Sequence, residues 1–185
     1  MFINYNIALN LPNLLTALRF LLTPFFLIFF YFLFIFPGKL LFGIPSLVFF
    51  LLISATDILD GYVAKKKGLI TDFGASFDIA ADFFFRSSSL ILFSFLKIIP
   101  FWLTAVYIIF FISFILDYKI KRSKFRINIF GKTTPVIYNA FIGMIVLNSF
   151  YLIAFLSHDM VIFISIILSA LTLIAIFEGL VFSKA

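Results

Sequence analysis

Four aspartates lie close together in the chain, and their spacing points to metal chemistry. Asp57 and Asp60 are three residues apart, and Asp78 and Asp82 are four apart, so each pair falls on one face of a helix. If the two helices are antiparallel neighbours with these faces opposed, the four carboxylates converge and repel one another unless cations intervene. Carboxylate oxygens are hard ligands, so we expect a site for two divalent ions, Mg²⁺ or Mn²⁺.

Small residues share these two faces. Gly61 and Ala64 lie on the face of Asp57, and Gly74 lies on the face of Asp78. Glycine inside a helix costs about 1 kcal/mol relative to alanine, so two glycines beside the carboxylates need a reason. Without a side chain, each lets a ribose, a base or a neighbouring backbone approach closely.

The elements that must position these residues are membrane helices. Hydrophobic residues make up 64% of the 185 residues and charged residues 12%, against about 25% charged in soluble proteins. Several apolar runs exceed the roughly 20 residues that span a bilayer. We therefore predict an all-α integral membrane protein with one domain over residues 1–185. It has a short interfacial segment at residues 1–12 and six spans, at about residues 14–36, 41–65, 73–96, 101–117, 133–156 and 160–182.

The basic residues predict the orientation of the bundle. With six spans, residues 65–67, residues 119–132 and the C-terminal tail lie on one side and hold most of the lysines and arginines. Both termini and the aspartates should therefore face the cytoplasm, in the cell (inner) membrane. Because the basic residues adjoin membrane segments, the net charge of +6 favours an anionic lipid surface or a phosphorylated substrate, and we expect no nucleic acid partner.

The aspartate spacing also resembles a family signature. Seven residues match the pattern of the CDP-alcohol phosphatidyltransferases with every gap of the right length: Asp57, Asp60, Gly61, Ala64, Gly74, Asp78 and Asp82. Lys65 stands where the family usually has arginine, and it still offers a cation to a phosphate but lacks the planar fork.

This resemblance implies phospholipid synthesis from CDP-diacylglycerol and a small polar alcohol, with release of CMP, by a homodimer. It implies that Asp57, Asp60 and Asp78 are metal ligands and that Asp82 is the general base and a further ligand. The nucleotide-binding residues would be Asp57, Gly61, Ala64, Lys65, Gly74 and Asp78.

Two further stretches are similar to phosphatidylglycerophosphate synthases: residues 11–19, and residues 131–134 before the fifth span. They favour glycerol 3-phosphate as the acceptor, whereas Phe83, where that subfamily usually has lysine, and Pro135 depart from its pattern. The candidate phosphate-binding residues are Asn13, Thr16 and Arg19 on one helix face, the basic residues Arg122, Arg126 and Lys132, and Arg86. Arg86 alternatively forms an i, i+4 ion pair with Asp82.

Two alternatives remain open at the level of sequence. The same chemistry could use inositol phosphate, serine or phosphatidylglycerol as the acceptor. Intramembrane carboxylates could instead serve divalent-cation or proton transport. A transport path would need polar groups that continue across the membrane, whereas the second and third spans are apolar beyond the aspartates, apart from Arg86, Ser54 and the serines at residues 87–89.

Overall fold

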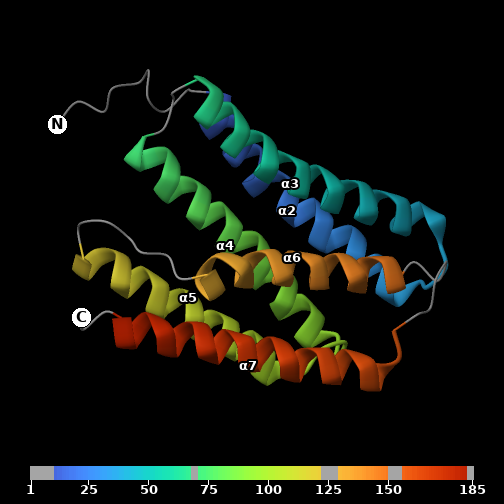
Figure 1. Ribbon diagram of the computed structural model, residues 1–185. Helices are drawn as coiled ribbons and strands as arrows, with labels where there is room; N and C mark the ends of the chain where they lie inside the picture. The colour runs from blue at the N-terminus through green and yellow to red at the C-terminus, as the bar shows by residue number, and fades with distance from the viewer. Residues whose placement is uncertain (1–10, 68–70, 122–128, 150–155, 183–185) are drawn as a thin grey trace. The chain divides into compact units, whose positions relative to one another are not determined.

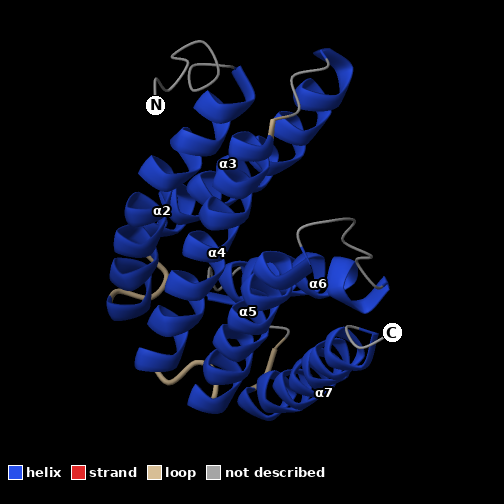
Figure 2. Ribbon diagram, turned by 90° about the vertical axis from the view of Figure 1, so that its left-hand side faces the viewer, coloured by secondary structure: helices blue, strands red, loops and turns tan. Residues whose placement is uncertain are grey.

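The computed structural model describes residues 11–67, 71–121, 129–149 and 156–182. In these residues the chain forms six α-helices and no strand (Figures 1 and 2). The helices are α2 (Leu11–Ile35), α3 (Leu40–Lys67), α4 (Asp72–Phe95), α5 (Phe101–Lys121), α6 (Ile129–Ser149) and α7 (His158–Phe182). The all-α prediction is confirmed. Most of the predicted interfacial segment, residues 1–10, lies outside the described residues, and Leu11 and Pro12 already belong to α2.

Three of these helices are long and apolar enough to cross a membrane. They contain the segments Leu11–Ile35, Leu40–Val63 and His158–Glu178, and Phe101–Ile115 is a shorter apolar helix. Their exposed surface carries large aliphatic and aromatic side chains, as lipid contact requires. The chain is therefore an integral membrane protein, and the count of six spans stays a prediction.

The helices fall into two compact units. One contains α2, α3 and α4 up to Ser88, and the other contains α4 from Ser89 onward with α5, α6 and α7. All four aspartates of the sequence motif belong to the first unit. This unit positions the site.

Helices α2 and α3 lie side by side and run in opposite directions (Figure 1). The turn between them contains Gly38, whose φ of +77° lies in the left-handed region that glycine adopts without strain. Pro24 and Pro45 lie inside α2 and α3, and each helix continues through its proline. The turn reverses the chain, so that the start of α2 lies near the end of α3, where Asp57 and Asp60 are found.

Phenylalanines join the three helices of this unit. Phe29 stacks on Phe49 of α3 with 5.5 Å between ring centroids, and Phe20 stacks on Phe77 of α4 at 5.3 Å. Phe26 is fully buried and meets Phe85 of α4 edge-on at 5.6 Å. Aromatic pairs at such distances add about 0.5–1.5 kcal/mol each beyond the area they bury. They fix α2 against both helices that carry aspartates.

In the second unit, α5 packs against α7, and buried polar groups pair across its helices. The Tyr138 hydroxyl of α6 lies 3.1 Å from that of Thr172 on α7, and the rings of Tyr138 and Tyr107 are 4.7 Å apart. Ser94 and Thr104 share a hydrogen bond of 2.6 Å. These contacts satisfy hydroxyls that would be costly to leave unpaired in an apolar interior.

Candidate metal and catalytic site

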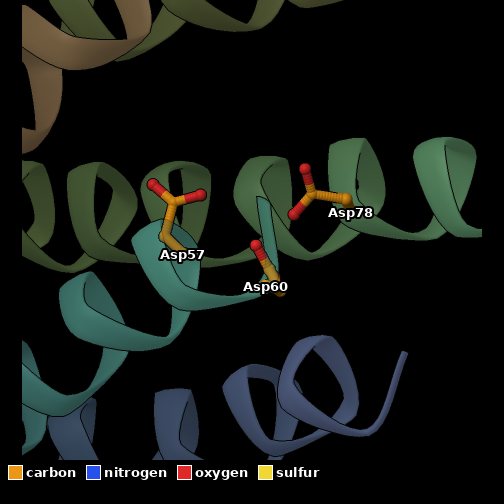
Figure 3. Close-up of side chains that lie close together, drawn as sticks. All are labelled: Asp57, Asp60 and Asp78. Atoms are coloured by element: carbon orange, nitrogen blue, oxygen red, sulfur yellow. The ribbon is translucent and has the colours of Figure 1, made fainter. Parts of the chain in front are cut away.

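Three carboxylates converge where α3 and α4 approach each other. Asp57 and Asp60 extend from α3 and Asp78 from α4 (Figure 3), and one oxygen of each lies within 4.8 Å of the others. The side chain of Asp60 is 5% exposed, that of Asp57 29% and that of Asp78 40%. The group is thus buried on the Asp60 side and open on the Asp78 side, as a site entered by a ligand requires.

Asp82 lies one helical turn after Asp78 and is held by two arginines. Its Oδ2 accepts a hydrogen bond of 2.8 Å from Arg86, four residues later on α4, so the predicted ion pair is confirmed. Its Oδ1 accepts a hydrogen bond from Arg19. A carboxylate offers about four lone-pair sites, so these two bonds leave Asp82 with further capacity to accept a proton. We call Asp57, Asp60, Asp78 and Asp82 the aspartate cluster.

The third helix, α2, contributes a cation to the cluster. Arg19 Nη2 lies 2.6 Å from Asp60 and 3.4 Å from Asp57, and Nη1 lies 3.0 Å from Asp78 and bonds Asp82. Its side chain is only 1% exposed. The sequence predicted Arg19 as a phosphate ligand and missed these carboxylate partners. The available signal was a lone charge deep in an apolar helix, which needs an opposite charge nearby.

The other residues predicted on the face of Arg19 also point toward α3 and α4. The Thr16 hydroxyl lies 3.1 Å from Asp60 Oδ2 and 3.1 Å from the Pro12 carbonyl, and its single hydrogen serves one of them at a time. Asn13 is buried, and its Oδ1 lies beside Gly74. The predicted face of Asn13, Thr16 and Arg19 is therefore an inward face of α2.

The two glycines of the motif have different surroundings. Among the described residues, a Cβ placed on Gly61 would meet no atom within 4 Å beyond the backbone of its own helix, so the space beside this residue is open there. A Cβ on Gly74 would lie 2.9 Å from Asn13 Oδ1 and 3.0 Å from Thr71 Oγ1. Gly74 therefore allows α2 to approach the start of α4, whereas the space at Gly61 is available to a ligand.

The residues present fit a divalent metal. Carboxylate oxygens are the ligands that Mg²⁺ and Mn²⁺ prefer. The four aspartates bring four negative charges and the two arginines two positive ones, which leaves two negative charges uncompensated within the cluster. A guanidinium already lies among the carboxylates, so their arrangement accepts a cation. Asp57, Asp60 and Asp78 would hold such an ion.

The remaining predicted site residues are only partly described. Ala64 and Lys65 lie on the last turns of α3 and Lys132 on the first turn of α6, and their side chains are outside the described part of the structure. Arg122 and Arg126 lie outside the described residues altogether. Their roles in nucleotide and acceptor binding stay predictions.

Comparison with known proteins agrees with the motif. The family model described as CDP-alcohol phosphatidyltransferase matches residues 9–178. Among curated relatives, the protein named CDP-diacylglycerol–glycerol-3-phosphate 3-phosphatidyltransferase of Rickettsia typhi is 41% identical over 73 residues, which cover 40% of this chain and 38% of the relative. The protein of the same name from Bacillus subtilis is 34% identical over 110 residues, 54% of this chain and 55% of the relative. The protein of the same name from Pseudomonas fluorescens is 43% identical over 74 residues, which cover 40% of this chain and 35% of the relative. These matches thus span between about a third and just over half of each relative.

Proposed function

Because the chain belongs to the CDP-alcohol phosphatidyltransferase family, we propose that it transfers a phosphatidyl group from CDP-diacylglycerol to glycerol 3-phosphate and releases CMP. The observation that carries the proposal is the convergence of Asp57, Asp60 and Asp78 from two helices into one group of oxygens. The names of the relatives specify glycerol 3-phosphate as their acceptor, which also agrees with residues 11–19 and 131–134.

Asp57, Asp60, Asp78 and Asp82 would hold two divalent ions. When bound, these ions neutralise the diphosphate of CDP-diacylglycerol and stabilise charge on its oxygens. Either Mg²⁺ or Mn²⁺ suits the oxygen ligands.

Asp82 acts as the general base in this proposal. It takes the proton from the acceptor hydroxyl, whose oxygen then attacks the phosphorus that carries diacylglycerol. The new O–P bond forms as the bond from that phosphorus to the oxygen of CMP breaks. The hydrogen bond from Arg86 orients the Asp82 carboxylate for this step. A positioned base typically contributes about 10²–10⁴-fold to the rate.

The nucleotide would bind beside the end of α3. The open space at Gly61 leaves room for the ribose or the base, and the Asp57 and Asp78 carboxylates lie next to it on the exposed side of the cluster. Ala64 keeps the same face free of bulk, and Lys65 supplies a positive charge for the diphosphate. Gly74 brings Asn13 against α4 and so shapes the wall of this space.

The acceptor carries its own phosphate and therefore needs cations. In the sequence, Arg122, Arg126 and Lys132 lie between α5 and the first turns of α6, and they would supply these cations.

We propose that the protein has six spans, with both termini and the aspartate cluster on the cytoplasmic side, where water-soluble glycerol 3-phosphate is available. We also propose that it assembles as a homodimer. The distribution of basic residues supports this orientation.

A reconstituted assay tests the proposed function. Purified protein with CDP-diacylglycerol and Mg²⁺ or Mn²⁺ is given glycerol 3-phosphate, serine, inositol, inositol phosphate or phosphatidylglycerol in separate reactions. We expect CMP and a phosphatidyl product with glycerol 3-phosphate and little turnover with the others. Faster transfer to another acceptor would refute the assignment of glycerol 3-phosphate as the acceptor. If folded protein supplied with metal transferred nothing to any acceptor, the proposed reaction itself would be refuted.

A further inference from the structure

Arg19 occupies the position in which a cation is most strongly attracted by the aspartate cluster. Its guanidinium reaches all four carboxylates, and its side chain is almost completely buried. Arg86, by contrast, lies one helical turn beyond Asp82 on α4 and forms an ion pair with it. The two arginines therefore carry the same charge, but one lies among the carboxylates and the other at their edge.

We propose that Arg19 is a positioning residue that holds the aspartate cluster together before metal binds and competes with divalent cations for the same carboxylate oxygens. The proposal rests on the metal site of the proposed function, and it adds a role for α2 in setting metal affinity. Repulsion among four close carboxylates would otherwise separate α3 from α4 in the metal-free protein.

Direct contact with the metal-binding oxygens is the reason for competition. The Asp60 oxygen that accepts the 2.6 Å bond from Arg19 Nη2 also lies within hydrogen-bond distance of the Thr16 hydroxyl. Asp78 Oδ1 is likewise engaged by Nη1 at 3.0 Å. A metal ion that binds these oxygens must displace the guanidinium or share them with a like charge, and both cost free energy.

The hydrogen bonding of Arg19 shows that this pairing is incomplete. Both Nη atoms donate to carboxylates, whereas Nε is buried without a hydrogen-bond partner in the described part of the chain. A buried donor without a partner is unfavourable. One donor of the guanidinium is thus left unsatisfied in the cluster, which favours its replacement there by another cation.

Metal affinity without substrate tests the proposal. We would titrate Mn²⁺ into wild-type, Arg19→Gln and Arg86→Gln protein in the absence of CDP-diacylglycerol and measure free Mn²⁺ by electron paramagnetic resonance. We expect Arg19→Gln to bind Mn²⁺ about tenfold more tightly than wild type, within the usual range of coupling between two sites. Arg86→Gln removes the same charge from the edge of the cluster, so its gain in affinity should be clearly smaller.

Stability in the same three proteins gives a second measurement. With a chelator, Arg19→Gln should unfold at a lower temperature than wild type, and Mn²⁺ should raise its midpoint by more than it raises that of wild type. Recovery of folded Arg19→Gln only in the presence of Mn²⁺ would support the proposal in the same way.

Affinity for Mn²⁺ that is unchanged or weaker in Arg19→Gln would overturn the proposal, as would an equal gain in Arg86→Gln. These outcomes are separate from the proposed function. Wild-type protein that transfers phosphatidyl groups while Arg19→Gln binds Mn²⁺ no more tightly would refute only the role of Arg19. A gain in affinity without any transfer by wild type would refute only the reaction.

Discussion

At the level of single residues, each charge in the first unit is compensated in its own way. Ionisable groups in membrane segments are costly, so each needs a partner or a function. Asp60 and Arg19 are nearly inaccessible and paired, whereas Asp57 and Asp78 keep part of their surface exposed. In the proposed function, Asp57 and Asp78 are therefore the carboxylates that a substrate can reach, and the buried pair of Asp60 and Arg19 anchors the cluster.

Asp82 is the residue whose change should affect chemistry most selectively. Asp82→Asn keeps the size of the side chain but cannot take a proton, so CMP release should fall by about 10²–10⁴-fold. The measurement is the rate of CMP release by purified protein with saturating CDP-diacylglycerol. Asp159→Asn, an exposed change at the start of α7, is the control and should leave the rate unchanged. Unchanged turnover in Asp82→Asn would remove Asp82 as the base.

Gly61 allows steric effects on the protein and on the ligand to be separated. In the part of the chain that the structure describes, the new Cβ of Gly61→Ala meets no atom within 4 Å beyond its own helix backbone. Alanine in a helix is favoured over glycine by about 1 kcal/mol, so thermal stability should stay equal or rise. If the nucleotide approaches this position, the KM for CDP-diacylglycerol should rise at the same time.

Gly74→Ala is the matched control for that change. Its Cβ would lie 2.9 Å from Asn13 Oδ1, so this variant should lose stability as Asn13 and Thr71 shift. Thermal unfolding and KM measured on both variants give the comparison. A Gly61→Ala protein with unchanged KM would show that the nucleotide binds elsewhere.

At the scale of elements, the sequence predicted the helices well and their partners less well. Long apolar runs predicted α2 and α3 because the length of an apolar run is a local property of the sequence. The opposed aspartates of α3 and α4 were also foreseen, from spacing on a helix face. The approach of α2 to that site was not, because the contact of Arg19 with residues about 40 to 60 positions away depends on packing that no local pattern encodes.

The phenylalanines between α2 and its neighbours are the packing that makes this contact possible. Phe26→Ala removes a fully buried ring that meets Phe85, and such a change costs about 3–5 kcal/mol in protein cores. We expect a lower unfolding midpoint in detergent together with tighter Mn²⁺ binding, because α2 then no longer holds the competing Arg19 guanidinium among the carboxylates. Phe34→Ala on the same helix, where the ring is 43% exposed, should change neither property. Equal effects of the two variants would contradict the role given to Phe26.

At the scale of the whole molecule, the membrane decides which side the substrates come from. Helix α3 has 28 residues and is about 42 Å long, more than the roughly 30 Å of hydrocarbon that it must cross. Lys39 and Lys66 lie near its two ends. The aspartates therefore lie near one membrane surface, and the basic residues predict that it is the cytoplasmic one.

The absence of cysteine from the sequence makes this orientation simple to measure. Single cysteines at exposed positions, introduced as Lys39→Cys, Lys66→Cys and Lys97→Cys, can be labelled in cells with a thiol reagent that does not cross membranes. We expect Lys39→Cys and Lys97→Cys to react in intact cells and Lys66→Cys to react only after permeabilisation. The reverse pattern would place the aspartate cluster on the outer side.

Product stoichiometry shows whether the aspartate cluster transfers a phosphatidyl group to glycerol 3-phosphate. Purified protein with Mn²⁺, CDP-diacylglycerol and glycerol 3-phosphate should form one CMP for each phosphatidylglycerophosphate. Asp78→Asn, which removes a charge from the three-oxygen group, should lose both products together. Undiminished transfer by Asp78→Asn, or CMP release by wild type without a phosphatidyl product, would contradict the account.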